Sequence, residues 1–239
     1  MIPKIIHYCW FGGKPLPPLA VRCIASWRKY LPDYAIKRWD ESNFDIQAVA
    51  YTREAYARKK YAFVSDYARF KVLYDEGGIY LDVDVELLRP LDNLLARGPY
   101  LGDEQPGRCN PGLGMACEPA MPFVKEMLEG YARRSYLNEP PASTIVTYTS
   151  AALARHGYAG SNGIQRVVGF TIYPAEYFCP INYFTKERVV TPNTYSIHHY
   201  AESWVSRRMK IYEMCNRLLG VENTRRLASL LKKCKRHGL

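Results

Sequence analysis

Hydrophobic and polar positions in the first half of the chain switch between the two-residue period of strands and the 3.6-residue period of helices. The pattern predicts strands at 3–8 and 34–39 and helices at 19–30 and 44–60. Strands that alternate with helices indicate an α/β domain, with a mixed, mostly parallel sheet flanked by helices.

Residues 66–76 are predicted to form a further helix whose two ends are marked in the sequence. Ser65 occupies the expected N-cap position, because its hydroxyl can accept a hydrogen bond from the first turn. Gly77 and Gly78 follow the last turn, and glycine readily adopts the left-handed conformation of a C-cap.

An acidic segment follows this helix directly. Asp82, Asp84 and Glu86 alternate with apolar residues, which predicts a strand over 79–87 with all three carboxylates on one side. Clustered carboxylates repel each other unless a cation lies among them. The segment therefore predicts a divalent metal ion, Mn²⁺ or Mg²⁺, and a phosphate-bearing substrate; a solvated strand face is the alternative.

The second half of the chain contains weaker signals. Strand-like pieces occur at 100–101, 171–173 and 196–198, and helical patterns at 123–136 and 144–156. Ligands of α/β sheets bind beyond the carboxyl ends of the strands, so Asp82 and Asp84 are expected near that edge.

Composition narrows the class of protein further. The chain has 239 residues and a net charge of +10, and the seven cysteines are scattered without a CxxC pair. A disulfide framework or zinc site is therefore not expected, and a reducing cytosol fits. The N-terminus lacks the features of a signal peptide, and no apolar run is long enough for a membrane span.

Three further groups carry candidate chemistry. Asp66 and Arg69 are three residues apart on the predicted helix, a spacing that fits a clamp for sugar hydroxyls; a surface ion pair is the alternative. The segment 196–204 offers adjacent histidines and Trp204 for a metal shell and a pocket wall. His7 and Trp10 end the first strand, where Trp10 could stack on a nucleobase or belong to the core.

Taken in order, the segments IPKIIHYCW, SDYARFKVLYDEGGIYLDVDV and SIHHYAESW resemble the DXD-containing sugar-transferase family of the GT-A fold. That family includes fungal initiating α-mannosyltransferases and bacterial capsular polysaccharide and O-antigen glycosyltransferases, and the glucosylating toxins are similar more remotely. The resemblance covers residues 1–90 and 196–204. It implies a Rossmann-like GT-A domain over 1–204 and retaining, metal-dependent transfer of a hexose or N-acetylhexosamine from a nucleotide-diphosphate sugar, with UDP favoured and GDP second.

The resemblance also implies roles for individual residues. The implied donor contacts are Trp10 and Ser65 at the base and ribose, Asp66 and Arg69 at the sugar, Tyr80 at the diphosphate and Asp82 at the ribose or metal. His7 and Trp204 complete the expected nucleotide-sugar site, and Asp66, Arg69, Asp82 and Asp84 form the expected catalytic set. Asp84 is the main expected metal ligand.

The late segment departs from the family pattern, because Tyr200 replaces a tryptophan and Glu202 stands where glycine is usual. His198 is the preferred third metal ligand, with His199 as the alternative and Glu202 as a less favoured one. No residue stands out as a covalent nucleophile, so we expect front-face transfer, in which the leaving phosphate takes the acceptor's proton.

Residues 205–239 are rich in lysine and arginine among regularly spaced leucines, which predicts a basic amphipathic helical tail. The expected partner of the tail is the anionic cytoplasmic face of a bacterial membrane, where a lipid-linked saccharide acceptor would be presented; packing on the catalytic domain is the alternative. A free saccharide acceptor stays open, and nucleic acid is not expected. Two other functions remain: a metal-dependent phosphohydrolase or nuclease, and a non-enzymatic nucleic-acid-binding module.

Overall fold

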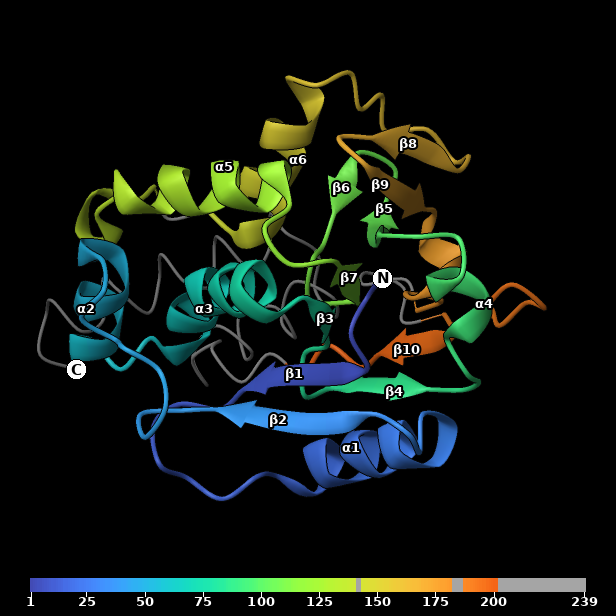
Figure 1. The fold of residues 1–239 in the computed structure, drawn as a ribbon, viewed down its shortest axis with the longest axis horizontal. Helices are drawn as coiled ribbons and strands as arrows, with labels where there is room; N and C mark the ends of the chain where they lie inside the picture. The colour runs from blue at the N-terminus through green and yellow to red at the C-terminus, as the bar shows by residue number, and fades with distance from the viewer. Residues whose placement is uncertain (141–142, 182–186, 202–239) are drawn as a thin grey trace, which may run out of the picture. The chain divides into compact units, whose positions relative to one another are not determined.

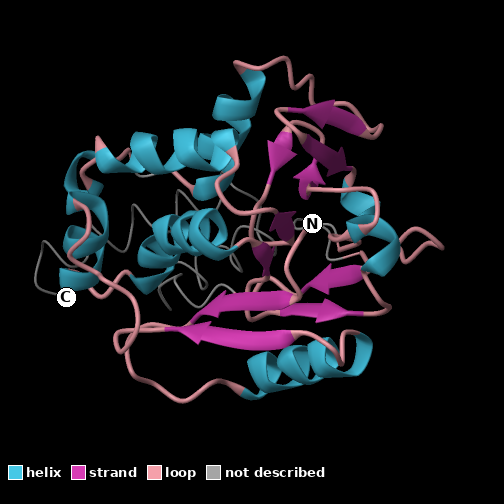
Figure 2. Cartoon of the chain, in the orientation of Figure 1, coloured by secondary structure: helices cyan, strands magenta, loops and turns pink. Residues whose placement is uncertain are grey.

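The computed structural model of the chain describes residues 1–140, 143–181 and 187–201 (Figure 1 and Figure 2). These residues belong to one compact unit, Met1–Ala201. The predicted tail at 205–239 and the candidate residues Trp204 and Glu202 lie outside the described residues. The domain boundary at 204 therefore stays a prediction.

A mixed sheet runs in the order β2-β1-β3-β7-β5-β9-β8, and β6 pairs with β5 beside this path. The pairs β1–β2, β1–β3 and β5–β9 are parallel, and the remaining pairs of this sheet are antiparallel. Its strands are β1 (Ile5–Cys9), β2 (Ala35–Trp39), β3 (Gly78–Tyr80), β5 (Tyr100–Gln105), β6 (Arg108–Cys109), β7 (Met115–Cys117), β8 (Gln165–Val167) and β9 (Phe170–Tyr173). The predicted α/β class is confirmed.

The helices flank this sheet, and several are shorter than their sequence pattern suggests. They are α1 (Pro18–Tyr30), α2 (Ala50–Ala57), α3 (Tyr61–Glu76), α4 (Asp92–Leu95), α5 (Pro122–Ala132) and α6 (Ile145–Ala154), with 3₁₀ turns η1 (Tyr136–Asn138) and η2 (Ala175–Tyr177). The helix predicted at 44–60 begins only at Ala50. The Asp45 carboxylate accepts from the Gln47 N–H at 2.9 Å, and such local bonds favour turns over helix.

Helix α3 begins at Tyr61, four residues before the predicted N-cap. The Ser65 assignment as N-cap was wrong: its hydroxyl lies inside the helix and donates to the Tyr61 carbonyl at 3.2 Å. The predicted C-terminal end is confirmed, because Gly77 has a φ of 64° and its N–H donates to the Leu73 carbonyl.

The strand predicted at 79–87 is two strands, β3 and β4 (Val85–Leu87), joined through a tight turn. The Val85 N–H donates to the Asp82 carbonyl at 3.0 Å and closes this turn. Strand β3 joins the main sheet, whereas β4 pairs with β10 (Ser196–His198) in a second, two-stranded sheet. The prediction of one continuous strand was wrong, because the alternation of polar and apolar residues continues through the turn and does not reveal that the chain changes direction there.

Helix α1 supports the small sheet from below in Figure 1. Its buried residues recur at helical spacing and end at Trp27, whose indole N–H donates to the Val85 carbonyl at 2.7 Å. The Ser26 hydroxyl accepts from the Leu87 N–H at 2.9 Å. These bonds hold β4, and with it the acidic turn, against a rigid helix.

Two hydrophobic clusters stabilise the unit. One contains residues of α2, α3, α5 and α6, including Phe70 and Tyr131, and the other contains residues of α1 and α4, including Leu94. Figure 1 shows α1 and α3 on opposite sides of β1 and β2. In the described part of the chain, no helix combines the length and the apolar character needed to cross a bilayer.

Asp103 on β5 is a buried carboxylate whose ionisation opposes folding. Burial raises its pKa from 3.8 to about 6, although the Tyr158 hydroxyl donates to it at 2.6 Å. The folded state then binds this proton more tightly than the unfolded chain does, so stability is lost as the pH rises through about 6. We expect Asp103→Asn to raise the free energy of unfolding by about 1–2 kcal/mol near pH 8, with little gain near pH 4. Urea unfolding at both pH values measures this, and an equal effect at both would contradict it.

Candidate active site

Asp66 and Arg69 lie one turn apart on α3 and form a buried ion pair. Arg69 Nη2 lies 3.3 Å from Asp66 Oδ1 and 3.3 Å from Asp82 Oδ1, so one guanidinium joins two carboxylates. Arg69 is only 4% exposed, and its Nη1 has no hydrogen-bond partner among the described residues. A surface ion pair is thereby excluded, and a buried donor remains available for a ligand oxygen, since leaving it unpaired costs about 1–3 kcal/mol.

The environment of Asp66 shifts its titration toward neutral pH. Burial raises its pKa to about 7, Arg69 lowers it and the nearby Asp82 raises it. A perturbed carboxyl group beside an unpaired guanidinium nitrogen is typical of a functional site.

Asp82 lies two residues after the end of β3 and is held by groups from three segments. The Tyr80 hydroxyl donates to Asp82 Oδ1 at 3.1 Å, and the Asp82 N–H donates to the Gly112 carbonyl at 2.9 Å. The Arg69 guanidinium lies 4.7 Å from the centre of the Tyr80 ring. The carboxylate therefore has a defined orientation beside Arg69.

Asp84 lies across the turn from Asp82 and is 9% exposed. His198 Nε2 on β10 lies 3.4 Å from Asp84 Oδ1, and the Ala201 N–H donates to Oδ2 at 2.8 Å. Burial alone would raise the pKa of Asp84, but His198 and the Ala201 N–H outweigh it and lower the pKa to about 2. Asp84 is therefore an anion at neutral pH.

Asp82, Asp84 and His198 each offer a ligand atom, and these atoms lie within 4.8 Å of one another. Ligands of an octahedral ion at about 2.1 Å are separated by about 3 Å when adjacent and about 4 Å when opposite. Two carboxylate oxygens and an imidazole nitrogen also suit Mn²⁺ in chemistry. The residue types present therefore fit the predicted metal ion, and their ligand atoms would have to approach one another slightly to surround it.

Glu86 and His199 do not join this cluster. His199 Nε2 lies 2.8 Å from Glu86 Oε2, and His199 follows β10 directly, while Glu86 is opposite Ile197 in the β4–β10 register. The prediction that Glu86 shares a side with both aspartates was wrong, because the turn at 83–84 reverses the alternation. Of the two candidate histidines, the structure brings His198 to the aspartates.

The predicted nucleotide contacts lie around the end of β1. Trp10 follows this strand, is partly exposed, and donates its indole N–H to the Lys14 carbonyl at 2.6 Å. Ser65 lies on α3, and both Ser65 and Arg69 interact with the thiol of Cys9 beside Trp10. Cys9 packs in the cluster that contains residues of α3, whereas Trp10 packs against the other cluster, so the contacts of Trp10 and Ser65 with a base stay predictions.

His7 is fully buried and has both ring nitrogens in use. The Trp39 indole N–H donates to Nδ1 at 3.0 Å, and Nε2 lies 2.8 Å from the Gly77 carbonyl. Burial lowers the pKa of His7, which agrees with a neutral ring that donates through Nε2. These contacts leave neither ring nitrogen for a nucleotide and tie β1 to β2 and to the end of α3.

Gly112 and Asn110 are site residues that the sequence did not reveal. A Cβ at Gly112 would overlap the Asp82 carboxylate and approach Arg69 Nη1 to 3.0 Å. The Gly112 N–H donates to Asn110 Oδ1 at 2.8 Å, and Asn110 Nδ2 donates to Glu104 at 3.0 Å. The Asn-Pro-Gly sequence signals a turn, but nothing local places that turn against Asp82.

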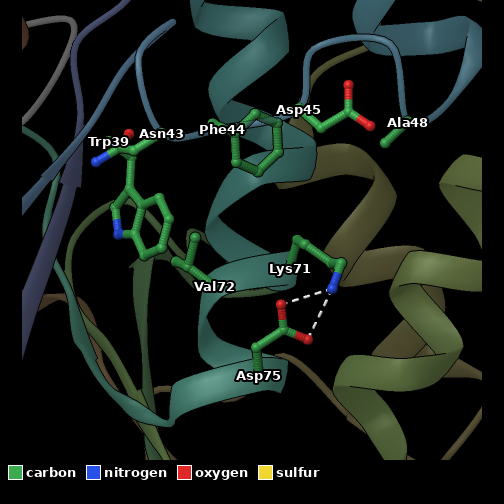
Figure 3. A pocket seen from close by; sticks show the side chains of 8 residues that line it. All are labelled: Trp39, Asn43, Phe44, Asp45, Ala48, Lys71, Val72 and Asp75. Atoms are coloured by element: carbon green, nitrogen blue, oxygen red, sulfur yellow. Dashed lines mark hydrogen bonds and ion pairs between the residues drawn. The ribbon is translucent and has the colours of Figure 1, made fainter.

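A shallow pocket shown in Figure 3 lies away from these residues. It has a volume of about 210 Å³, and its walls include Trp39, Phe44 and the ion pair between Lys71 and Asp75. At about 100° per residue, Lys71 and Asp75 lie on the opposite side of α3 from Asp66. This pocket is therefore not part of the acidic cluster.

The family resemblance predicted from the sequence is confirmed. Residues 17–101 match the model of the family described as "Glycosyltransferase sugar-binding region containing DXD motif". The matched segment contains Asp66, Arg69, Asp82 and Asp84, and His198 lies beyond it.

Two curated relatives are fungal. The chain is 31% identical to inositol phosphoceramide mannosyltransferase 3 of Schizosaccharomyces pombe over 153 residues, which cover 62% of this chain and 42% of the relative. It is 26% identical to inositol phosphoceramide mannosyltransferase 1 of the same organism, over 55% of this chain and 43% of the relative. The chain thus spans less than half the length of these relatives.

The fold is similar to a solved structure, that of the PaToxG glycosyltransferase. The TM-score is 0.53 at 19% identity, over 64% of this chain and 68% of that chain. At this identity the similarity concerns the fold, and the predicted GT-A class is confirmed.

Proposed function

We propose that the protein is a retaining glycosyltransferase that moves a hexose or N-acetylhexosamine from a nucleotide-diphosphate sugar to a saccharide acceptor. The observation that carries this proposal is the Arg69 guanidinium, which joins Asp66 to Asp82 and has a buried nitrogen left for a ligand. UDP is the favoured donor nucleotide and GDP the second. Because two relatives are named mannosyltransferases, mannose belongs among the hexoses to test.

In this proposal, each group of the site has a separate task. Asp66 accepts hydrogen bonds from hydroxyls of the donor sugar, and Arg69 Nη1 donates to a sugar or phosphate oxygen. Tyr80 and Arg69 keep the Asp82 carboxylate in place. Trp10 and Ser65 bind the base and ribose of the donor nucleotide.

Asp82, Asp84 and His198 would hold Mn²⁺ or Mg²⁺, which neutralises the charge that develops on the departing diphosphate. The Ala201 N–H fixes the Asp84 carboxylate toward this position. With retention and without a covalent nucleophile, the acceptor hydroxyl attacks from the face that the diphosphate leaves, and the leaving phosphate takes its proton. Arg69, which lies on α3, stabilises the negative charge that develops on the departing diphosphate.

The proposal is tested by thermal unfolding with nucleoside diphosphates and by hydrolysis of UDP- and GDP-sugars. We expect UDP or GDP to raise the unfolding temperature only with Mn²⁺ or Mg²⁺, and EDTA to abolish donor hydrolysis. Proton NMR of the released sugar identifies the anomer formed first. Stabilisation by no nucleotide with either metal would contradict the proposal, and phosphate release from simple esters would favour the phosphohydrolase alternative.

The cellular setting is a further part of the proposal. A lipid-linked oligosaccharide in bacterial surface polysaccharide synthesis is the proposed acceptor, reached at the cytoplasmic face of the membrane. The support is the concentration of lysine and arginine in 205–239, which would attract an anionic leaflet.

Deleting 221–239 is expected to weaken binding to anionic vesicles by at least about tenfold, because each basic residue near such a surface contributes about 1 kcal/mol. Cosedimentation with vesicles of phosphatidylglycerol and phosphatidylcholine measures the loss, and vesicles of phosphatidylcholine alone are the control. Unchanged binding after the deletion would remove the tail from this role.

A further inference from the structure

A second pocket lies where α2, α3 and the segment after α5 meet. It has a volume of about 330 Å³, and its lining residues are Arg58, Phe63, Tyr136, Leu137, Glu139, Pro140 and Ser143. We call it the Phe63–Tyr136 pocket, after the two rings that meet edge to face at 5.0 Å between their centres.

Helix α3 places this pocket on the far side of Asp66 from Ser65, a residue of the proposed nucleotide site. With Tyr61 as zero and about 100° per residue, Ser65 lies at about 40°, Asp66 at about 140° and Phe63 at about 200°. Asp66 and Phe63 are three residues apart, so their Cβ atoms are about 5–6 Å from each other. The order around the helix is therefore Ser65, Asp66 and the pocket residue Phe63.

Arg134, two residues after the end of α5, connects the pocket wall with the surroundings of Asp66. Its guanidinium donates two hydrogen bonds to Glu139 at 2.5 Å and one to Ser143 at 2.8 Å. It also lies 5.7 Å from the centre of the Tyr51 ring, and it lowers the pKa of Asp66. Arg134 thus bonds to two residues of the pocket lining and also influences the charge of Asp66, which does not itself line the pocket.

The lining has the chemistry that a sugar ring requires. Tyr136 and the half-exposed Leu137 present apolar surface to the C–H face of a pyranose. Glu139 accepts hydrogen bonds, and its pKa is lowered chiefly by its bonds with Arg134, so it is ionised at neutral pH. Arg58 is exposed and offers donors to hydroxyls at the rim.

We propose that the Phe63–Tyr136 pocket binds the saccharide acceptor. This inference rests on the proposed function, because only a glycosyltransferase would bind a donor sugar at Asp66. The pocket directs the acceptor to the side of the donor sugar away from the nucleotide base, and its size suits one or two sugar rings.

The test compares Arg58→Ala and Tyr136→Ala with Arg53→Ala, an exposed arginine on α2 that does not line the pocket. Transfer is measured to p-nitrophenyl glycosides of glucose, galactose and mannose, and donor hydrolysis is measured without a glycoside. We expect both pocket variants to raise the KM for the glycoside about tenfold and to leave donor hydrolysis within about twofold of wild type. Arg53→Ala should change neither quantity. An unchanged KM in both pocket variants would overturn the inference.

Saturation-transfer NMR with the same glycosides separates this inference from the proposed function. If no nucleotide-sugar is hydrolysed, the proposed function fails, and the NMR signals still decide whether the pocket binds saccharide. A signal with wild type that is lost in Tyr136→Ala supports the pocket. No signal with wild type, or a signal that persists in a folded Tyr136→Ala, overturns it.

Discussion

Replacing Asp84 by asparagine is expected to lower glycosyl transfer by at least about 100-fold. It should also lower the free energy of unfolding near neutral pH, because the lowered pKa of Asp84 means that its ionised form stabilises the folded state. The amide keeps an oxygen for the Ala201 N–H, but it removes the negative charge that faces His198 and the proposed metal ion. Donor hydrolysis over a range of Mn²⁺ concentrations measures the effect. Calorimetric titration with Mn²⁺ should show a matching loss of affinity.

Glu86→Gln is the matched control for this variant. Glu86 lies two residues further along the same segment and is bonded to His199 instead of the acidic cluster. We expect it to keep at least about half of the wild-type rate, since it contacts neither Asp82 nor Asp84. If Asp84→Asn retains near wild-type turnover and Mn²⁺ affinity, Asp84 does not have the proposed role.

Replacing Gly112 by alanine is the second change with a large expected effect. The new methyl group would overlap the Asp82 carboxylate, lie 2.8 Å from its Cγ and crowd Arg69. Asp82 is short and is held by Tyr80 and Arg69, so it has to leave its position. A displacement of about 1 Å at a reacting centre can cost about 100-fold in rate, and we expect a loss of that size.

Gly163→Ala is the control for this change. Gly163 has an ordinary backbone conformation, and a Cβ there would meet only the Ser161 hydroxyl at 3.6 Å. Donor hydrolysis and thermal unfolding should both stay close to wild type in this variant. A Gly112→Ala protein with full activity would mean that Asp82 does not need its present position.

Local sequence was sufficient for several parts of the site. Asp66 and Arg69 share a side of α3 because residues three apart on any helix do so. The end of that helix at Gly77 was also predicted correctly, because a left-handed C-cap is a property of the residue itself. The family resemblance then indicated which acids matter.

Local sequence failed wherever a distant segment decides the geometry. Residues 79–87 read as one strand, yet β3 pairs with β1 and β7 while β4 pairs with β10. Ser65 read as an N-cap, yet α3 extends one turn further toward its N-terminus. The first error arises because the strand partners are remote in sequence. The second is local, since the Ser65 hydroxyl bonds to the Tyr61 carbonyl four residues earlier.

The sequence by itself determined the α/β class, the helix that carries Asp66 and Arg69, and the acidic pair at 82 and 84. These features depend on periodicity and spacing within about twenty residues. Only the tertiary structure decided that the imidazole of His198, and not that of His199, lies beside the Asp84 carboxylate, that His7 has both nitrogens occupied, and that Gly112 packs against Asp82. The physical reason is that these contacts join segments far apart in the chain, and their geometry is set by sheet pairing and packing, which no local pattern records.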